Sequence, residues 1–327
     1  MDIITELKKS NLRGRSGSGY LTGLKWEMVK GAKALKKYII CNASEGEPLV
    51  YKDYYILKNH LKEVLSGIEV ALNTFKKSQA YIYFKPDYYK EFRRKIPKNI
   101  IVFKKEKEYI AGEETSAIQA IEGNKPEPRV KPPFPTEKGL YGMPTLINNV
   151  ETFYYVFKIF QKKYNQERFY SIQGDIKNKG VFELKDNLSI QDILKKTNNW
   201  PNFDFFVQAG GGASGEILLS SELKKSISGI GSLIVYNTKK TDPYLLMEKW
   251  ADFFINNNCD KCVPCREGLF RIYEIIKEKD LKNPVLKDLF LVLEKTSLCA
   301  LGRFSVKPFS SLIKKWDKLK FPSIIKK

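Results

Sequence analysis

The chain has 327 residues, 43% of them hydrophobic and 13% aromatic, which suits a folded protein of more than one domain and excludes a disordered or low-complexity chain. Lys and Arg number 57 against 37 Asp and Glu, a net charge of +20, but lysine is spread without a basic block or an aromatic-interleaved stripe, so we expect no nucleic-acid binding. No apolar run approaches the roughly 20 residues that span a bilayer and the N-terminus lacks an apolar signal core, so we expect a cytoplasmic protein without direct membrane insertion, which would reach the membrane face only through partners.

A glycine-rich segment at 13–26 opens the first zone of the chain. Its glycines, Gly14, Gly17, Gly19 and Gly23, permit positive φ and a close approach of the backbone to a ligand. The helical run after Thr22 would turn its amide end toward an anion such as a phosphate. The segment follows no predicted strand and lacks a Gly-Lys-Ser/Thr ending, so it is neither a Rossmann fingerprint nor a P-loop, and a plain flexible loop is the alternative.

The rest of the first zone alternates strand and helix patterns, as an α/β layer fold does. The pattern predicts strands at 37–41, 80–84 and 99–103 and helices at 53–76, 113–121 and 150–164. Cys41 ends an apolar run and is predicted to be a small core residue. His60 is the single histidine, and its charged neighbours indicate a surface position without a catalytic role. A Ser-His-Asp triad and a multi-histidine metal site are thereby disfavoured.

Three polar segments of the first zone, at 42–47, 109–115 and 147–152, have side chains suited to a nucleotide or a flavin. The first of them follows the strand at 37–41, and α/β proteins bind ligands at the carboxyl ends of their strands. Carboxylates could hold ribose hydroxyls, and amides could hold a ribityl chain or a ring edge. The alternative is that these Asn and Glu side chains cap helices.

The second and third zones have different patterns. Short strands and turn residues with a helix at 189–195 predict a small α+β module at 168–240. From 241 onward the pattern is helical, with predicted helices at 244–255, 269–277, 285–293 and 308–316.

Four of the five cysteines lie in the helical zone, at 259, 262, 265 and 299. A tight triple of thiolates with a remote fourth is typical of a [4Fe-4S] cluster. Zinc usually takes two separated pairs of ligands, so zinc, like a role without metal, fits this spacing less well. Pro264 keeps the segment between the second and third cysteines from closing into a regular helix.

Six motifs occur in order along the chain: GRSGSGYLTGLKW, CNASEGEPLVYKD, YIAGEETSAI, KPPFP, NNVET, and CDKCVPCREG with a remote CALG. Through these six motifs the chain resembles the NADH-binding flavoprotein subunit of respiratory complex I (NuoF-like). This family includes diaphorase subunits of NAD-linked hydrogenases and formate dehydrogenases. The resemblance extends over nearly the whole chain. It implies a Rossmann-like FMN- and NADH-binding α/β domain at 1–167, a ubiquitin-like (SLBB) α+β domain at 168–240 and a helical bundle with one [4Fe-4S] cluster at 241–327.

The resemblance also implies functional residues by their position in the motifs. The expected FMN contacts, with the glycines of the first motif, are Gly14, Arg15, Gly17, Gly19, Lys25, Asn42, Ser44, Glu45, Tyr109, Gly112, Glu113, Asn148 and Asn149. The expected NADH contacts are Tyr20, Lys25, Glu47, Glu114 and Phe134, with Glu47 and Glu114 in the catalytic centre. The expected cluster ligands are Cys259, Cys262, Cys265 and Cys299. Met28 stands where the family commonly has an aromatic residue against the adenine.

The activity implied by the resemblance is NADH oxidation: a hydride passes to FMN, and single electrons pass to the cluster and on to partner subunits. The implied partners are a thioredoxin-like [2Fe-2S] subunit (NuoE-like) and a larger iron-sulfur subunit (NuoG-like, or the electron-transfer subunit of a hydrogenase or formate dehydrogenase). Alternatives are an RnfC-like flavin/SLBB electron carrier without NADH oxidation, and a structural iron-sulfur protein with affinity for nucleic acid. The terminal acceptor and the choice between NADH and NADPH stay open.

Overall fold

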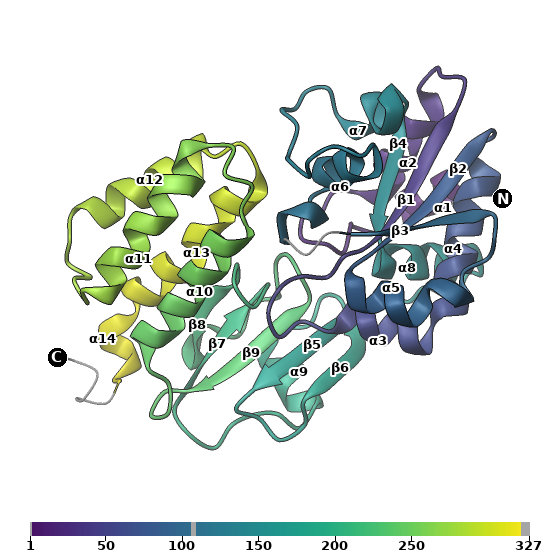
Figure 1. The fold of residues 1–327 in the computed structure, drawn as a ribbon. Helices are drawn as coiled ribbons and strands as arrows, with labels where there is room; N and C mark the ends of the chain where they lie inside the picture. The colour runs from purple at the N-terminus through teal and green to yellow at the C-terminus, as the bar shows by residue number, and fades with distance from the viewer. Residues whose placement is uncertain (1, 106–108, 322–327) are drawn as a thin grey trace. The chain divides into compact units, whose positions relative to one another are not determined.

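The structure is a computed structural model that describes residues 2–105 and 109–321 (Figure 1). The chain divides into two compact units, one of Met1–Gly46 with Tyr51–Phe169 and one of Glu47–Val50 with Tyr170–Lys327. Within the described ranges, every helix is too short or too polar to cross a membrane.

A four-stranded parallel sheet forms the centre of the first unit, in the order β3-β2-β1-β4. Its strands are β1 (Lys37–Ala43), β2 (Ser78–Phe84), β3 (Ile100–Lys104) and β4 (Thr145–Asn149). From β1 the chain proceeds to β2 and β3 on one side and returns to β4 on the other, so the strand order reverses between β1 and β4. At such a point the loops after the two strands diverge and leave room for a ligand at the carboxyl edge of the sheet.

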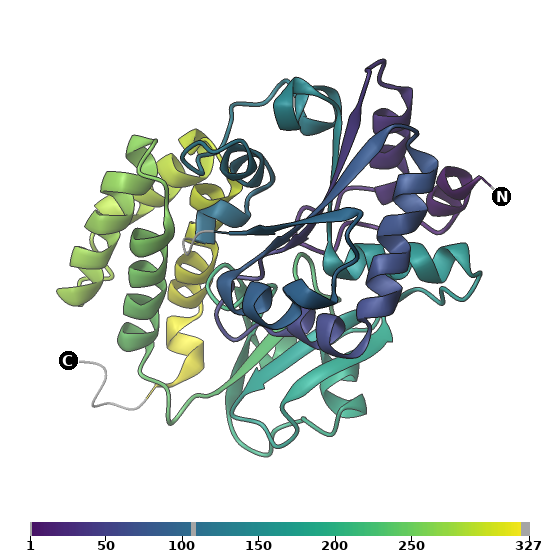
Figure 2. The ribbon, with the colours of Figure 1, turned by 45° about the vertical axis from the view of Figure 1, so that its right-hand side comes forward.

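Helices cover both faces of this sheet (Figures 1 and 2). They are α1 (Ile3–Lys9), α2 (Thr22–Gly31), α3 (Lys52–Asn59), α4 (Leu61–Thr74), α5 (Pro86–Phe92), α6 (Glu114–Ile121), α7 (Pro135–Lys138) and α8 (Val150–Phe160), with 3₁₀ turns at Arg93–Lys95, Tyr109–Gly112 and Leu140–Gly142. On one face Ile118 of α6 is buried in a cluster with Ile40 and Ile147. Helices α4 and α8 pack together and against β1. Cys41 of β1 is fully buried, which confirms its prediction as a core residue, and burial raises the pKa of its thiol well above the ordinary value.

The predicted helix at 53–76 is wrong as one continuous helix. Its chain forms α3 and α4, separated at His60, whose φ of −136° and ψ of 30° are not helical. The His60 ring lies 6.1 Å from that of Tyr55 and 5.1 Å from that of Tyr154 of α8. These ring contacts occur where the helix is interrupted at His60. The contact with Tyr154 joins residues that are distant in sequence, so the periodicity of the sequence does not predict it. The helix predicted at 150–164 ends at Phe160.

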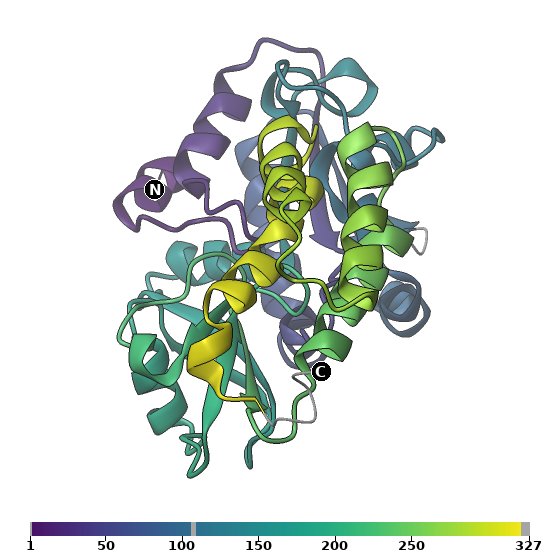
Figure 3. The same cartoon turned by 90° about the vertical axis from the view of Figure 1, so that its left-hand side faces the viewer.

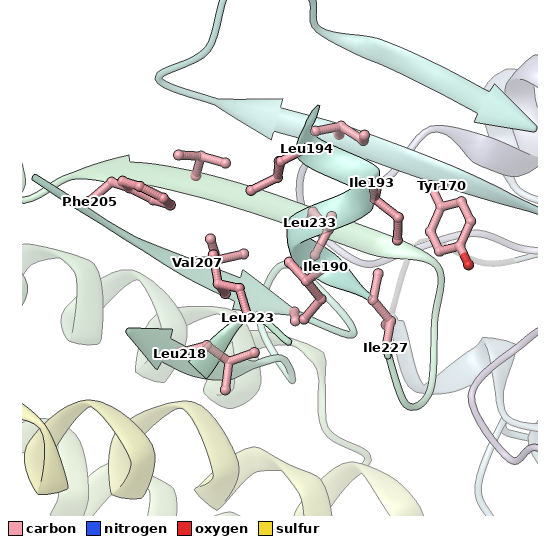
Figure 4. Close-up of a cluster of buried hydrophobic side chains, with 13 residues drawn as sticks. Tyr170, Ile190, Ile193, Leu194, Phe205, Val207, Leu218, Leu223, Ile227 and Leu233 are labelled. Atoms are coloured by element: carbon pink, nitrogen blue, oxygen red, sulfur yellow. The ribbon is translucent and has the colours of Figure 1, made fainter. Parts of the chain in front are cut away.

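A five-stranded mixed sheet in the order β6-β5-β9-β7-β8 belongs to the next part of the chain. Its elements are β5 (Glu167–Gly174), β6 (Gly180–Lys185), α9 (Ile190–Lys196), β7 (Phe205–Ala209), β8 (Glu216–Leu219), a 3₁₀ turn (Ser220–Glu222) and β9 (Ser232–Asn237). Ile190 and Ile193 of α9 share a buried cluster with Val207 and Leu233 of the sheet (Figure 4). Ser189 caps α9 by accepting a hydrogen bond from the amide of Asp192. The ubiquitin-like assignment of this module stays a prediction.

Helices packed side by side form the C-terminal part of the second unit (Figure 3). They are α10 (Pro243–Asn257), a π-helical turn (Pro264–Gly268), α11 (Leu269–Lys277), α12 (Val285–Thr296), α13 (Ala300–Lys314) and α14 (Trp316–Leu319). The helix predicted at 308–316 is wrong in its bounds, because α13 begins at Ala300 and contains Pro308 in its interior. An interior proline costs about 3 kcal/mol. Burial of the neighbouring Phe309, whose ring lies 5.7 Å from that of Trp250, stabilises the helix against that cost.

Candidate functional site

The carboxyl ends of β1 and β4 bring two of the predicted polar segments together. The strands are parallel neighbours, and their register pairs Cys41 with Asn148 and Asn42 with Asn149. The side-chain amide of Asn149 donates hydrogen bonds to the backbone oxygen of Asn42 at 3.3 Å and to Oδ2 of Asp53 at 2.6 Å. The sequence analysis did not predict strand β4. Its sequence, TLINN, ends in two polar residues and so lacks the apolar run of a buried strand, but all five of its residues are buried.

The third polar segment joins the same edge through Gly112. The Asn42 side-chain amide donates to the backbone oxygen of Gly112 at 2.8 Å, and its Oδ1 accepts from the backbone nitrogen and the hydroxyl of Ser44. A Cβ atom at Gly112 would lie 2.7 Å from Oγ of Ser44, so the turn at Tyr109–Gly112 can approach β1 only with glycine there. The three polar segments therefore meet at one edge of the parallel sheet.

A buried ionic network supports the loop after β1. Nζ of Lys52 lies 2.6 Å from Oδ1 of Asp53 and 3.1 Å from Oε2 of Glu151, and all three side chains are at most 3% exposed. Burial, with the charge of Asp53 next in effect, raises the pKa of Glu45 to about 7. Tyr88 donates a hydrogen bond to Oε2 of Glu45 at 2.7 Å. The sequence analysis did not predict Lys52, Asp53, Tyr88 or Glu151 as parts of the site. Three of them lie within the quoted motifs, Lys52 and Asp53 in CNASEGEPLVYKD and Glu151 in NNVET.

The glycine-rich loop presents backbone rather than a charged side chain. Arg15 is buried, lies 3.9 Å from a carboxylate oxygen of Glu151 and donates to Oη of Tyr164 at 3.1 Å. Gly17 and Gly19 have φ of 108° and 62°, which only glycine adopts readily. A bare backbone of this kind suits a phosphate, because its amides can approach the anion closely. The buried arginine of this loop stabilises the unit from within.

Trp26 and Asn148 connect this loop to the sheet edge. The indole nitrogen of Trp26, on the helix that follows the loop, donates to Oδ1 of Asn148 at 3.0 Å. Loop, helix α2 and strand β4 are therefore joined by a buried hydrogen bond. With Asn42 and Asn149, this edge holds three amide side chains, each hydrogen-bonded to other groups of the protein.

Two lysines share the carboxylate of Glu114 at the start of α6. Nζ of Lys25 lies 3.1 Å from Glu114 Oε2, and Nζ of Lys131 lies 2.7 Å from Glu114 Oε1 and 3.0 Å from Glu113. Burial alone would raise the pKa of Glu114, but the two ammonium groups lower it to about 2. Lys131 is a member of this group that sequence reasoning missed, since it stands in KPPFP beside the predicted Phe134.

The alternative role of the polar residues as helix caps holds for two of them. Glu113 accepts from the backbone nitrogens of Thr115 and Ser116 at 2.8 and 3.0 Å, at the start of α6. Asn149 accepts from the backbone nitrogen of Glu151 at 3.0 Å, at the start of α8. These caps fix the side chains in place and leave their predicted contacts with FMN as proposals.

Exposed side chains on α2 and beside α7 are suited to stacking. Tyr20 is 48% exposed, Phe134 is 47% exposed and Met28 is 40% exposed, and the Tyr20 hydroxyl lies 3.5 Å from the Met28 sulfur. Helices α2 and α7 contact each other, and Phe134 immediately precedes α7. An exposed aromatic ring can pack against a planar base or nicotinamide.

Glu47 groups with the second unit and not with the other predicted nucleotide residues. It is 6% exposed, and its Oε2 accepts from the backbone nitrogen of Ala213 at 2.8 Å. The hydroxyl of Ser214 donates to its Oε1. The Glu47 carboxylate is thus held by a loop that sequence reasoning did not connect with it.

The four clustered cysteines lie on the π-helical turn, in the loop before it and at the start of α13. Burial raises the pKa of the Cys265 thiol, and the thiols of Cys262 and Cys299 raise it further. A Cβ atom at Gly302 would lie 2.6 Å from the Cys265 sulfur, which explains the glycine in CALG.

This donor set fits a [4Fe-4S] cluster better than a single ion. Across residues 2–105 and 109–321, no three His, Cys, Asp or Glu side chains are arranged to hold one metal ion. A four-iron cluster binds each thiolate through a different iron, so its ligands stand farther apart than those of one ion. Cys259, Cys262, Cys265 and Cys299 would hold it.

Comparison with known protein families gives two matches. Residues 7–158 match the Nuo51 FMN-binding domain, and residues 245–319 match the NADH-ubiquinone oxidoreductase-F iron-sulfur binding region. The first range contains the sheet edge described above, and the second contains all four clustered cysteines.

Curated relatives agree with these matches. An NADH-quinone oxidoreductase subunit of Rhizobium meliloti (strain 1021) is 31% identical over 82% of this chain and 74% of that protein. The NAD-reducing hydrogenase HoxS subunit alpha of Cupriavidus necator is 28% identical over 97% of this chain and 60% of that subunit.

A solved structure shares the fold. A crystal structure of an NAD⁺-reducing [NiFe]-hydrogenase in the H₂-reduced state superposes with a TM-score of 0.89 at 24% identity, covering 97% of this chain and 62% of that one. The chain therefore spans about three fifths of the hydrogenase subunits it matches.

Proposed function

This chain belongs to the family of NuoF-like NADH- and FMN-binding subunits, which includes the alpha subunits of NAD-reducing hydrogenases, and from this premise we propose that it oxidises NADH and delivers the electrons to partner subunits. When bound, FMN would supply the redox chemistry, because it accepts a hydride and releases electrons one at a time to an iron-sulfur cluster. No catalytic histidine is needed for such chemistry.

The chain's own residues bind and orient the two nucleotides. The backbone around Gly17 and Gly19 would hold the FMN phosphate, and Asn42 and Asn148 would hold polar groups of the flavin. Exposed rings at Tyr20 and Phe134 would stack on NADH. Lys25 and Glu114, joined by a 3.1 Å ion pair, would contact its ribose hydroxyls.

The observation that carries this proposal is the meeting of three sequence segments at one sheet edge. Asn42 pairs with Asn149 across β1 and β4 and donates a 2.8 Å hydrogen bond to Gly112. Parallel α/β sheets bind ligands at the carboxyl edge, at the point where strand order reverses. The polar side chains at this edge therefore stand where an α/β protein binds its cofactor.

We propose that the electrons pass from the four-cysteine motif to partner subunits, since among these 327 residues the fifth cysteine, Cys41, is buried in the sheet. Large apolar side chains beside the clustered cysteines are exposed: Val263 at 59%, Leu298 at 43% and Phe304 at 53%. Exposed apolar residues around a redox centre favour docking of a partner. We propose a thioredoxin-like [2Fe-2S] subunit and a larger iron-sulfur subunit as the partners.

The proposal is tested by anaerobic purification, measurement of FMN and iron, and assay of NADH oxidation with ferricyanide. Phe134→Ala should raise KM for NADH about tenfold, since one base–aromatic stack contributes about 1–3 kcal/mol. Phe160 is the matched control, because it is 48% exposed against 47% for Phe134 and lies at the end of α8. Phe160→Ala should leave KM unchanged. A protein loaded with FMN and iron that does not oxidise NADH would favour the RnfC-like alternative.

A further inference from the structure

The loop between β7 and β8, residues 210–215 with the sequence GGGASG, contacts the side chain of Glu47 and the backbone of Pro48. Oε2 of Glu47 accepts from the backbone nitrogens of Ala213 at 2.8 Å and Ser214 at 3.4 Å. Oε1 accepts from the Ser214 hydroxyl. Both oxygens of the carboxylate are therefore fixed by donors from one loop.

The glycines of this loop are required by the same contact. A Cβ atom at Gly212 would lie 1.7 Å from the backbone oxygen of Pro48, and one at Gly211 would lie 3.0 Å from Cδ of Glu47. Gly211 also has φ of 148°, a backbone conformation that other residues rarely adopt. The loop therefore lies directly against the chain at 47–48, with no room for a side chain at Gly212.

We propose that Ser214 is a positioning residue for the oxidation of nicotinamide nucleotides. With loop 210–215 it holds the carboxylate of Glu47 in one orientation for nucleotide recognition. This inference rests on the proposed function, together with the expectation from the sequence motifs that Glu47 contacts NADH. Hydrogen bonds from amides and a hydroxyl are strong when the acceptor is ionised, so they hold the carboxylate in one orientation.

A fixed negative charge also discriminates between the two nicotinamide nucleotides. NADPH carries one more phosphate than NADH, with roughly −1.5 to −2 charge at pH 7. With the Ser214 hydroxyl present, both oxygens of the Glu47 carboxylate are held. Without that hydroxyl only Oε2 keeps its backbone donors, so the carboxylate can rotate and Oε1 can turn away from the phosphate. Loss of the Ser214 hydroxyl should therefore weaken the binding of NADH and relax the exclusion of NADPH.

The test uses the purified holoprotein with NADH and NADPH as substrates and ferricyanide as acceptor. We expect Ser214→Ala to raise KM for NADH about fivefold with kcat nearly unchanged, and to reduce the NADH-over-NADPH ratio of kcat/KM by a similar factor. Ser214→Thr keeps the hydroxyl and should restore both values. Gly180→Ala, a glycine whose added Cβ would make only ordinary 3.7 Å contact with Phe182, is the control and should change neither.

A double-mutant cycle separates positioning of Glu47 from a general effect on folding. In a Glu47→Ala background, Ser214→Ala should cause no further change in KM, because its effect acts through Glu47. Binding of NAD⁺ by calorimetry gives a readout independent of turnover and should follow KM. If Ser214→Ala does not fold, Ser214→Cys replaces the hydroxyl by a weak thiol donor of similar shape and should shift KM and nucleotide preference in the same direction.

The outcomes are distinguishable. If the wild type neither binds nor oxidises NADH, the proposed function fails. If the wild type oxidises NADH and Ser214→Ala has an unchanged KM and an unchanged nucleotide preference, the positioning role is overturned and the proposed function stands. Equal effects of Ser214→Ala with and without Glu47 would also overturn it.

Discussion

The carboxylate of Glu114 forms ion pairs with two lysines, Lys25 and Lys131, which lower its pKa to about 2. The folded pKa lies below the ordinary value of 4.5, so the charged form is stabilised. Its contribution to stability is present above pH 4.5 and is lost as the pH falls toward 2. Between pH 6 and 8 the carboxylate stays ionised, so a change of nucleotide preference with pH in that range should come from the extra phosphate of NADPH, whose second pKa is about 6.

Removing this charge should narrow the preference for NADH over NADPH. We expect Glu114→Gln to lower the ratio of kcat/KM for the two nucleotides about tenfold, which corresponds to about 1.4 kcal/mol, because a negative charge no longer opposes the extra phosphate. The ratio is measured with ferricyanide at pH 6, 7 and 8. Glu91→Gln, at an exposed position of α5, is the control. A wild type that uses NADPH as well as NADH would contradict the assignment.

The cysteines differ in role according to their surroundings. Cys262→Ser should remove the [4Fe-4S] cluster or strongly destabilise it, because four thiolates hold four irons. Cys41→Ser should keep the iron content and lower stability by about 1–3 kcal/mol, since it introduces a hydroxyl into a fully buried position. Iron and sulfide assays on anaerobic preparations check the first expectation, and denaturant unfolding checks the second. Equal loss of iron from both variants would refute the cluster assignment.

At the scale of elements, the crossing of α4 and α8 depends on one glycine. A Cβ atom at Gly67 of α4 would lie 2.0 Å from the backbone oxygen of Phe153 in α8. Backbone of a packed helix cannot move aside as a flexible side chain can. We therefore expect Gly67→Ala to destabilise the protein by about 2 kcal/mol or more, despite the better helix propensity of alanine.

The matched change is Gly31→Ala at the end of α2, where an added Cβ meets no atom within 4 Å. It should be neutral or should stabilise the protein by up to about 1 kcal/mol, because alanine restricts the unfolded chain. Thermal or denaturant unfolding of both variants compares the two. Similar stabilities would show that α4 and α8 do not pack as closely as the structure has them.

At the scale of the whole molecule, the charge of +20 bears on assembly. A lysine-rich surface steers an acidic partner, and salt screens that attraction beyond about 10 Å at 0.1 M. We expect the isolated holoprotein to reduce ferricyanide from NADH and to reduce quinone or protons only when partner subunits are added. The apparent affinity of this protein for its partner subunits should fall at least tenfold between 0.05 and 0.5 M NaCl. It is measured by titrating the partner subunits against the quinone- or proton-reducing activity that they restore. Rapid reduction of quinone or protons by the isolated chain would contradict the need for partners.

Local patterns were sufficient for much of this architecture. Three predicted strands, at 37–41, 80–84 and 99–103, are present as β1, β2 and β3. A short run of apolar residues between turn residues is typical of a buried strand, so the local sequence was sufficient to predict them. The cysteine spacing predicted an iron-sulfur region, and the matched family region at 245–319 confirms its place in the chain. Both signals lie within a few consecutive residues, and neither depends on distant contacts.

Only the tertiary structure decided where the motifs meet and what supports them. The hydrogen bonds of Asn42 with Gly112 and of Ser214 with Glu47 join residues 70 and 167 positions apart, and no periodicity specifies such contacts. The break at His60, the buried strand TLINN and the proline within α13 arise for the same reason, because packing against neighbouring elements outweighs local propensity at each of them. The sequence alone predicted which residues contact the cofactors, because those predictions depend on short local motifs, and the fold determined how these residues are held, because their partners lie far away along the chain.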